Sequence, residues 1–152
     1  MAAVGERPLP GEEHWTQKGE VRLYLYEKRA QAAPRRGTIL FVHGSSMSSR
    51  PTFDLQVPGR PDSSAMDHFA RLGYDTWCVD MEGYGRSDRS RPINCDIANG
   101  ADDLAAASEY IARTRGAEKL MCYGISSGAL RAALFAQRHP GRVARLALDA
   151  FV

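Results

Sequence analysis

The chain has 152 residues, a length that suits one modest domain with a hydrophobic core. Hydrophobic residues make up 43% and charged residues 25% of the chain, and the formal net charge is only +2. This composition argues against a disordered chain, and the mixing of basic with acidic residues argues against a nucleic-acid stripe or a polybasic membrane anchor. The first residues lack a secretory signal and no apolar run reaches membrane-spanning length, so we expect a cytoplasmic protein.

The three cysteines are Cys78, Cys95 and Cys122, without the close spacing that is typical of metal-binding or redox motifs. Cys78 and Cys122 lie inside apolar runs typical of strands. We therefore expect free thiols that are buried, and the sequence predicts neither a metal nor an organic cofactor.

The start of the chain predicts a leader and two strands. Residues 1–19 are polar, and we interpret them as a leader that precedes a folded core in residues 20–152. Apolar and polar side chains alternate over residues 20–27, which predicts a half-exposed strand at a sheet edge. The continuous β-prone run at residues 38–42 predicts a strand that is buried on both faces.

Two helices are predicted in the middle of the chain. A loop over residues 45–61 leads to a helix that Asp62 or Ser63 caps and that Gly73 ends. After a strand at residues 74–79 and a glycine-bearing loop at 80–99, a second helix runs from about 100 to 115. Asn99 is its expected cap, Gly116 ends it, and its apolar face excludes Asp103.

The remaining residues predict a strand at 119–123, a helix that ends before Pro140, and a strand at 143–149. Apolar strands thus alternate with amphipathic helices along the chain. This order predicts an α/β fold, with a mostly parallel sheet covered by helices on both faces. Functional side chains are expected where the parallel strands end, which is the position of His43, Asp80, Ser126 and Asp149.

The most informative motif is G-x-S-x-G, formed by Gly124, Ile125, Ser126, Ser127 and Gly128. The same spacing occurs by chance in ordinary glycine-rich turns. Here a predicted strand precedes it and a predicted helix follows it, and this context makes Ser126 a candidate nucleophile on a tight turn. Small residues on both sides of such a turn let neighbouring backbone approach closely.

Three motifs together resemble the α/β-hydrolase family: F-V-H-G at residues 41–44, D-M-E-G-Y-G-R-S at residues 80–87, and G-I-S-S-G at residues 124–128. Their order and spacing match over about residues 20–150. The resemblance implies an α/β-hydrolase fold that stops after about its sixth strand. It also implies a serine hydrolase that acts on a small ester or related acyl substrate.

The resemblance further implies roles for residues around Ser126. Backbone N–H groups of Ser127 and Ser45 would hold the oxyanion, with Gly44, Gly124 and Gly128 shaping the surrounding loops. His43 is expected to support the loop in preference to acting as a base, and Asp80 to bond backbone groups.

A catalytic base is missing from this assignment. In the family the order along the chain is serine, acid, histidine, and the only histidine after Ser126 is His139, near the far end of a helix. Asp149 could fill the acid position. We interpret the chain as the amino-terminal part of a longer hydrolase, which predicts little esterase turnover by itself. Its exposed sheet edge would favour association with another copy or with a complementary carboxyl-terminal part.

Two other classes of function are alternatives. Gly83 and Gly85 follow a strand, as in dinucleotide-binding folds, but the third small residue and an adjoining helix are lacking. A non-catalytic binding protein on the same fold is the stronger alternative, because the catalytic histidine is absent. Serine at the turn disfavours dehalogenase and epoxide-hydrolase chemistry, in which the resemblance places an aspartate nucleophile.

Overall fold

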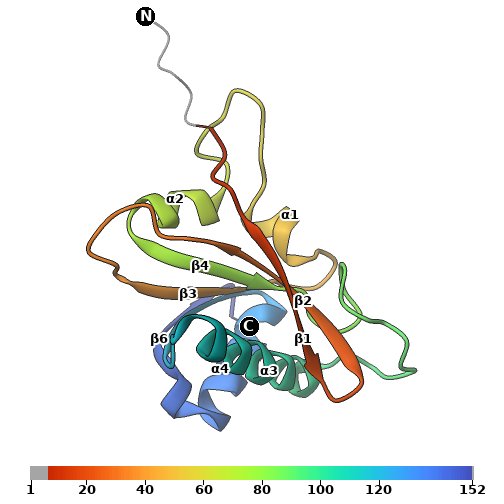
Figure 1. The fold of residues 1–152 in the computed structure, drawn as a ribbon. Coiled ribbons are helices and arrows are strands. Elements are labelled where there is room, and N and C mark those ends of the chain that lie inside the picture. The colour runs from red at the N-terminus through yellow and green to blue at the C-terminus, as the bar shows by residue number, and fades with distance from the viewer. Residues whose placement is uncertain (1–6, 152) are drawn as a thin grey trace, which may run out of the picture.

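The computed structural model describes residues 7–151 and contains one six-stranded sheet with helices on both faces (Figure 1). The strands are β1 Glu12–Lys18, β2 Val21–Lys28, β3 Gly37–Val42, β4 Tyr74–Val79, β5 Leu120–Ile125 and β6 Val143–Asp149. Their spatial order is β1-β2-β4-β3-β5-β6, and the last four in that order are parallel. The predicted mostly parallel α/β sheet is therefore confirmed.

The amino-terminal hairpin departs from the sequence prediction. Residues 12–18 were interpreted as part of a leader, but they form β1, which pairs antiparallel with β2 along its whole length. β2 in turn pairs antiparallel with β4, so β1 and not β2 is the outer strand on this side. The polar residues of β1 misled the prediction because most of them face solvent, while His14 and Thr16 are buried. Residues 1–6 of the expected leader lie outside the described residues.

Two hydrophobic clusters cover the two faces of the sheet. One contains side chains of α3 (Ile97–Arg115) and α4 (Ser127–Arg138) packed on the central strands, with Trp77 and Phe135 among its largest members. The other contains Phe53 of α1 (Ser49–Phe53) and Met66 of α2 (Ala65–Arg71). Figure 1 shows α3 and α4 together on one side of the sheet, with α1 and α2 on the other. None of the helices in residues 7–151 is long and apolar enough to cross a bilayer.

The bounds of the two middle helices differ from the predicted ones. Helix α3 begins at Ile97, and its cap is Asp96, whose side chain accepts a hydrogen bond from the Asn99 N–H. Asn99 lies within the first turn, so the predicted cap was three residues too late. Asp103 is fully buried, contrary to expectation, and its carboxylate lies 2.5 Å from the Lys18 ammonium of β1. This pairing explains how a charge is accommodated on the packed face.

The segment between β3 and α2 is more ordered than the predicted loop. It contains α1, and α2 is capped by Ser64, whose hydroxyl accepts from the Asp67 N–H, one residue beyond the predicted cap positions. The buried Lys28 ammonium lies 2.6 Å from Asp54 and 2.5 Å from Asp67. A buried ammonium between two carboxylates fixes the end of α1 and the start of α2 against β2.

Cys78 and Cys122 are buried free thiols, as predicted, whereas Cys95 is only half-buried. Burial raises the pKa of both Cys78 and Cys122 to about 12. These two thiols therefore stay protonated at neutral pH and act as small core side chains.

Candidate active site

Ser126 lies at the junction between β5 and α4, with its side chain exposed at the carboxyl end of the parallel strands. Its backbone has φ 57° and ψ −129°, a left-handed conformation that L-residues other than glycine rarely adopt. The Ser126 N–H donates to the Asp149 carbonyl at 3.0 Å, and the Ala129 N–H donates to the Ser126 carbonyl at 2.8 Å. These bonds hold the strained residue in place.

The glycines of the motif are required by close backbone contacts. A Cβ on Gly124 would overlap the carbonyl oxygen of Gly128, and a Cβ on Gly128 would overlap the carbonyl oxygens of Val42 and His43. Helix α4 therefore begins directly against the end of β3. This approach explains why the residues two positions on either side of Ser126 carry no side chain.

Gly44 brings the loop after β3 against the serine. A Cβ on Gly44 would lie 3.0 Å from the Ile125 carbonyl oxygen and 3.6 Å from the Ser126 hydroxyl oxygen. The candidate oxyanion loop therefore lies close to the candidate nucleophile, with no side chain of Gly44 between them.

His43 is fully buried, and both of its ring nitrogens are occupied. Nε2 accepts the Met81 N–H at 3.0 Å, which leaves the ring proton on Nδ1, and Nδ1–H donates to the Gly44 carbonyl at 2.7 Å. Burial lowers the pKa of His43, and the nearby Arg131 charge lowers it further. This neutral ring supports the loop, as the sequence predicted, and has no free nitrogen for proton transfer.

The conformation of this loop orients the N–H of Ser45. In a trans peptide the carbonyl and the following N–H point in opposite directions. Because the Gly44 carbonyl points to the His43 ring, the Ser45 N–H points away from that ring. The Ser45 and Ser127 hydroxyls lie 2.9 Å apart, which places the two candidate oxyanion residues side by side.

Asp80, at the end of β4, organises the neighbouring loops. One carboxylate oxygen accepts the N–H and hydroxyl of Ser49, at 2.8 and 2.6 Å, and the other accepts the Arg86 N–H at 2.9 Å. Its burial and backbone partners agree with the expected structural role. Through Asp80 the end of β4 is linked to the start of α1.

The exposed Asp149 ends β6 beside the candidate nucleophile. Its backbone carbonyl binds the Ser126 N–H, while its carboxylate accepts the Tyr123 hydroxyl at 2.7 Å. Burial, followed by this bond to the carboxylate, raises the pKa of Tyr123 to about 12. Asp149 is thus placed near Ser126 through its backbone, but its carboxylate is engaged by a tyrosine and by no histidine in residues 7–151.

The histidines of the described chain have other positions or partners. His14 contacts Tyr110 and Glu27, and His43 is occupied as described. His68 lies in α2, and His139 follows the carboxyl end of α4, away from Ser126, as expected from the sequence. Within residues 7–151 no histidine forms a hydrogen bond with Ser126.

Arg131 was missed by the sequence analysis. Its guanidinium is buried under the loop after β3 and donates from Nη1 to the His43 carbonyl at 3.1 Å. A signal was available, because Gly128, Ala132 and Phe135 mark the buried face of α4 and Arg131 falls on that face. A charged residue at such a position indicates a specific role.

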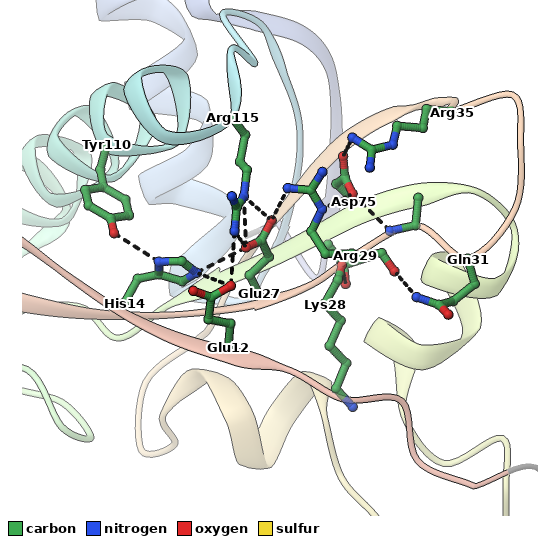
Figure 2. A network of polar contacts seen from close by, with 12 residues as sticks. Glu12, His14, Glu27, Lys28, Arg29, Gln31, Arg35, Asp75, Tyr110 and Arg115 are labelled. Carbon is green, nitrogen blue, oxygen red and sulfur yellow. Dashed lines mark hydrogen bonds and ion pairs between the residues drawn. The ribbon is translucent and has the colours of Figure 1, made fainter.

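A second polar cluster, shown in Figure 2, lies between β1, β2 and α3. Side-chain atoms of Glu12, His14 and Glu27 lie within 4.8 Å of one another, a separation that could suit a metal ion. However, Arg115 donates to both Glu27 oxygens, at 2.8 to 3.2 Å, and to Glu12 at 3.1 Å. Arg115 supplies the positive charge that balances the carboxylates. The cluster is therefore an ion-pair network that joins α3 to β1 and β2.

Comparison with known proteins agrees with this geometry. The sequence model of the α/β-hydrolase fold family matches residues 37–151. No curated protein sequence matches the chain.

Similar solved structures include a predicted CIB-like hydrolase from Thermoplasma acidophilum, at 17% identity and a TM-score of 0.70. An epoxide hydrolase A from Mycobacterium thermoresistibile is 26% identical with a TM-score of 0.70, and a membrane phospholipase A described as a bacterial virulence factor is 26% identical with a TM-score of 0.66. The alignments cover 92%, 91% and 91% of this chain, but only 62%, 39% and 39% of those proteins. The chain belongs to the α/β-hydrolase fold family, and it spans roughly two-fifths to three-fifths of the length of these similar structures.

Proposed function

We propose that this chain carries the nucleophile and the oxyanion hole of a serine hydrolase that cleaves a carboxylic ester or a related acyl bond. The observation that carries the proposal is the strained, exposed Ser126 beside Gly44, at the ends of β5 and β3. Strain of this kind is costly, and it persists where the surrounding structure enforces it for a function.

The proposed chemistry begins with attack of the Ser126 oxygen on the substrate carbonyl carbon. The carbonyl electrons move to oxygen, and the N–H groups of Ser45 and Ser127 would bind the resulting oxyanion. Such preorganised donors stabilise charge that exists only in the transition state, by about 3 to 4 kcal/mol each. The positive end of the α4 dipole lies at the same place.

The identity of the residue at the bend favours acyl chemistry. The similar structures include both a phospholipase and epoxide hydrolases, so the fold alone leaves the reaction open. The family resemblance associates epoxide opening with an aspartate nucleophile at this position, and this chain has Ser126 there.

Attack by Ser126 also needs a base that accepts its proton, and no histidine in residues 7–151 bonds to it. We therefore propose that the activity belongs to a longer protein of which this chain is a part and which supplies the base; it is called the full-length protein in the experiments below. The isolated 152-residue chain is expected to show little turnover. A non-catalytic binding protein on the same fold is the alternative that this observation favours.

Labelling with a fluorophosphonate tests the proposal. The full-length natural protein should gain one covalent adduct by intact mass, and Ser126→Ala should gain none. Ser90→Ala, in an exposed loop, is the matched control and should be labelled like the wild type. A folded wild-type protein that remains unlabelled would contradict the hydrolase assignment and favour the binding protein.

A further inference from the structure

Arg131 is a buried cation without an acidic partner among the described residues. Its relative exposure is 2%, and no carboxylate in residues 7–151 forms an ion pair with it. Its contacts are the His43 carbonyl at 3.1 Å and the Tyr84 ring, whose centroid lies 5.4 Å from the guanidinium carbon. Its Nε is buried and has no hydrogen-bond partner.

Such a placement is costly for folding. An arginine that loses its water without gaining a carboxylate destabilises the folded state, and an unpaired buried donor adds to that cost. A residue that contributed only to packing would be better replaced by methionine or leucine. The burial of a guanidinium here therefore calls for a specific reason.

The surrounding structure makes room for this side chain. Gly100 lies inside α3, where glycine weakens a helix relative to alanine. A Cβ at Gly100 would come within 2.5 Å of the Arg131 Cδ. The absence of a side chain at Gly100 thus leaves room for the Arg131 side chain where α3 packs against α4.

The guanidinium acts on the loop that carries the proposed oxyanion donor. Helical side chains lean toward the amino end of their helix, so Arg131 reaches back from the second turn of α4 toward Ser126. There it holds the His43 carbonyl, while the His43 ring holds the next carbonyl, that of Gly44. Hydrogen bonds thus hold two consecutive peptide groups, 43–44 and 44–45. The second of these groups contains the Ser45 N–H.

We propose that Arg131 is a positioning residue for the hydrolytic reaction. From beneath the loop it fixes the His43 and Gly44 peptides so that the Ser45 N–H stays aimed at the oxyanion. It also adds positive charge behind that loop. In this role Arg131 touches neither the substrate nor the nucleophile. The role rests on the proposed function.

The role predicts a specific kinetic pattern in the full-length natural protein. Arg131→Met should lower kcat for a p-nitrophenyl ester about 10- to 100-fold with little change in KM, because the oxyanion forms only in the transition state. Arg131→Lys, which keeps a charge and a donor, should recover part of the loss. Arg138→Met removes a charge from the exposed end of the same helix and should behave like the wild type.

A second variant and a second measurement distinguish loss of the positioning role from loss of folding. Gly100→Ala retains Arg131 but displaces it, and should lower kcat in the same way. In the isolated 152-residue chain, Arg131→Met should speed hydrogen exchange of the Met81 amide, which donates to His43 Nε2 at 3.0 Å, relative to wild type and Arg138→Met, under conditions where the thermal melts show all three to be folded.

These readouts distinguish the two proposals. If the wild type hydrolyses esters and folded Arg131→Met keeps its kcat within about twofold, the positioning role is wrong. If the wild type shows neither hydrolysis nor labelling, the proposed function fails and the positioning of a hydrolytic donor fails with it, whereas the Met81 exchange rate still tests the support that Arg131 gives to the loop. An unchanged Met81 exchange rate in Arg131→Met would contradict that support.

Discussion

The hydroxyl oxygens of Ser45 and Ser127 lie 2.9 Å apart and join the loop after β3 to the first residue of α4. Each residue also carries an N–H proposed to bind the oxyanion. Replacing either side chain by alanine keeps that N–H but removes the bond between the hydroxyls. The contact therefore separates the effect of loop position from the effect of the donors themselves.

For Ser45→Ala and Ser127→Ala we expect a slower fluorophosphonate reaction of the full-length protein, by less than about tenfold, because loss of a whole oxyanion donor costs about 10²- to 10³-fold. The double variant should be no slower than the slower single variant, since both remove the same bond. If the double variant were slowed by the product of the two single effects, the two hydroxyls would act independently.

The motif glycines should be intolerant of a methyl group. Gly124→Ala and Gly128→Ala each force a Cβ into backbone carbonyl oxygens, so we expect a loss of about 2 to 4 kcal/mol in the free energy of unfolding by urea. Gly128 lies in a helix, where helix propensity alone would make alanine more stable than glycine, so a loss of stability there must come from the overlap. Gly141→Ala meets no atom within 4 Å and should stay within about 0.5 kcal/mol of wild type. Equal stabilities would contradict the close approach of α4 to β3.

The lowered pKa of His43 predicts a pH dependence of stability. Because the folded chain resists protonation at this ring more than the unfolded chain does, the stabilisation is complete above pH 6.5 and is lost as the pH falls toward the folded pKa. His43→Asn should weaken this dependence in urea titrations between pH 7 and 5. Imidazole nitrogen spectra of the wild type should show the neutral ring with its proton on Nδ1. A folded-state pKa of His43 at or above 6.5 would contradict the assignment.

Association of the isolated chain is expected through β6. In residues 7–151 this strand pairs only with β5, and it exposes Leu146 and Leu148, with Phe151 nearby. An apolar strand edge of this kind pairs readily with another chain. Sedimentation of the 152-residue chain should show a mass that rises with concentration, and Leu146→Lys should reduce it. Ile93→Lys changes an exposed apolar residue in the loop before α3 and should leave the association unchanged. A wild-type chain that stays monomeric at all concentrations would contradict this prediction.

From β2 onward, with the exception of the short helix α1, the sequence was sufficient for the order of strands and helices, because apolar periodicity and glycine positions follow local rules. It also placed the G-x-S-x-G motif between a strand and a helix, where the backbone contacts permit only glycine on either side, and the catalytic role of Ser126 stays a prediction. It failed for β1 and Asp103, because their burial depends on partners distant in the chain, such as the Lys18 ammonium for Asp103. The position of Arg131 on the buried face of α4 could be read from the sequence, but its partner could not, because the His43 carbonyl is 88 residues away.

The buried Lys28 ammonium has a consequence for variation in the chain. It fastens the residues on both sides of the exposed stretch 55–62, through Asp54 before it and Asp67 after it. Gln56 adds to this anchor from inside the stretch, because its amide donates to Asp54 at 2.9 Å and to Asp67 at 3.1 Å. Longer or chemically different sequences grafted between Gln56 and Ser63 would leave these contacts in place, which makes that segment suited to carrying a reporter.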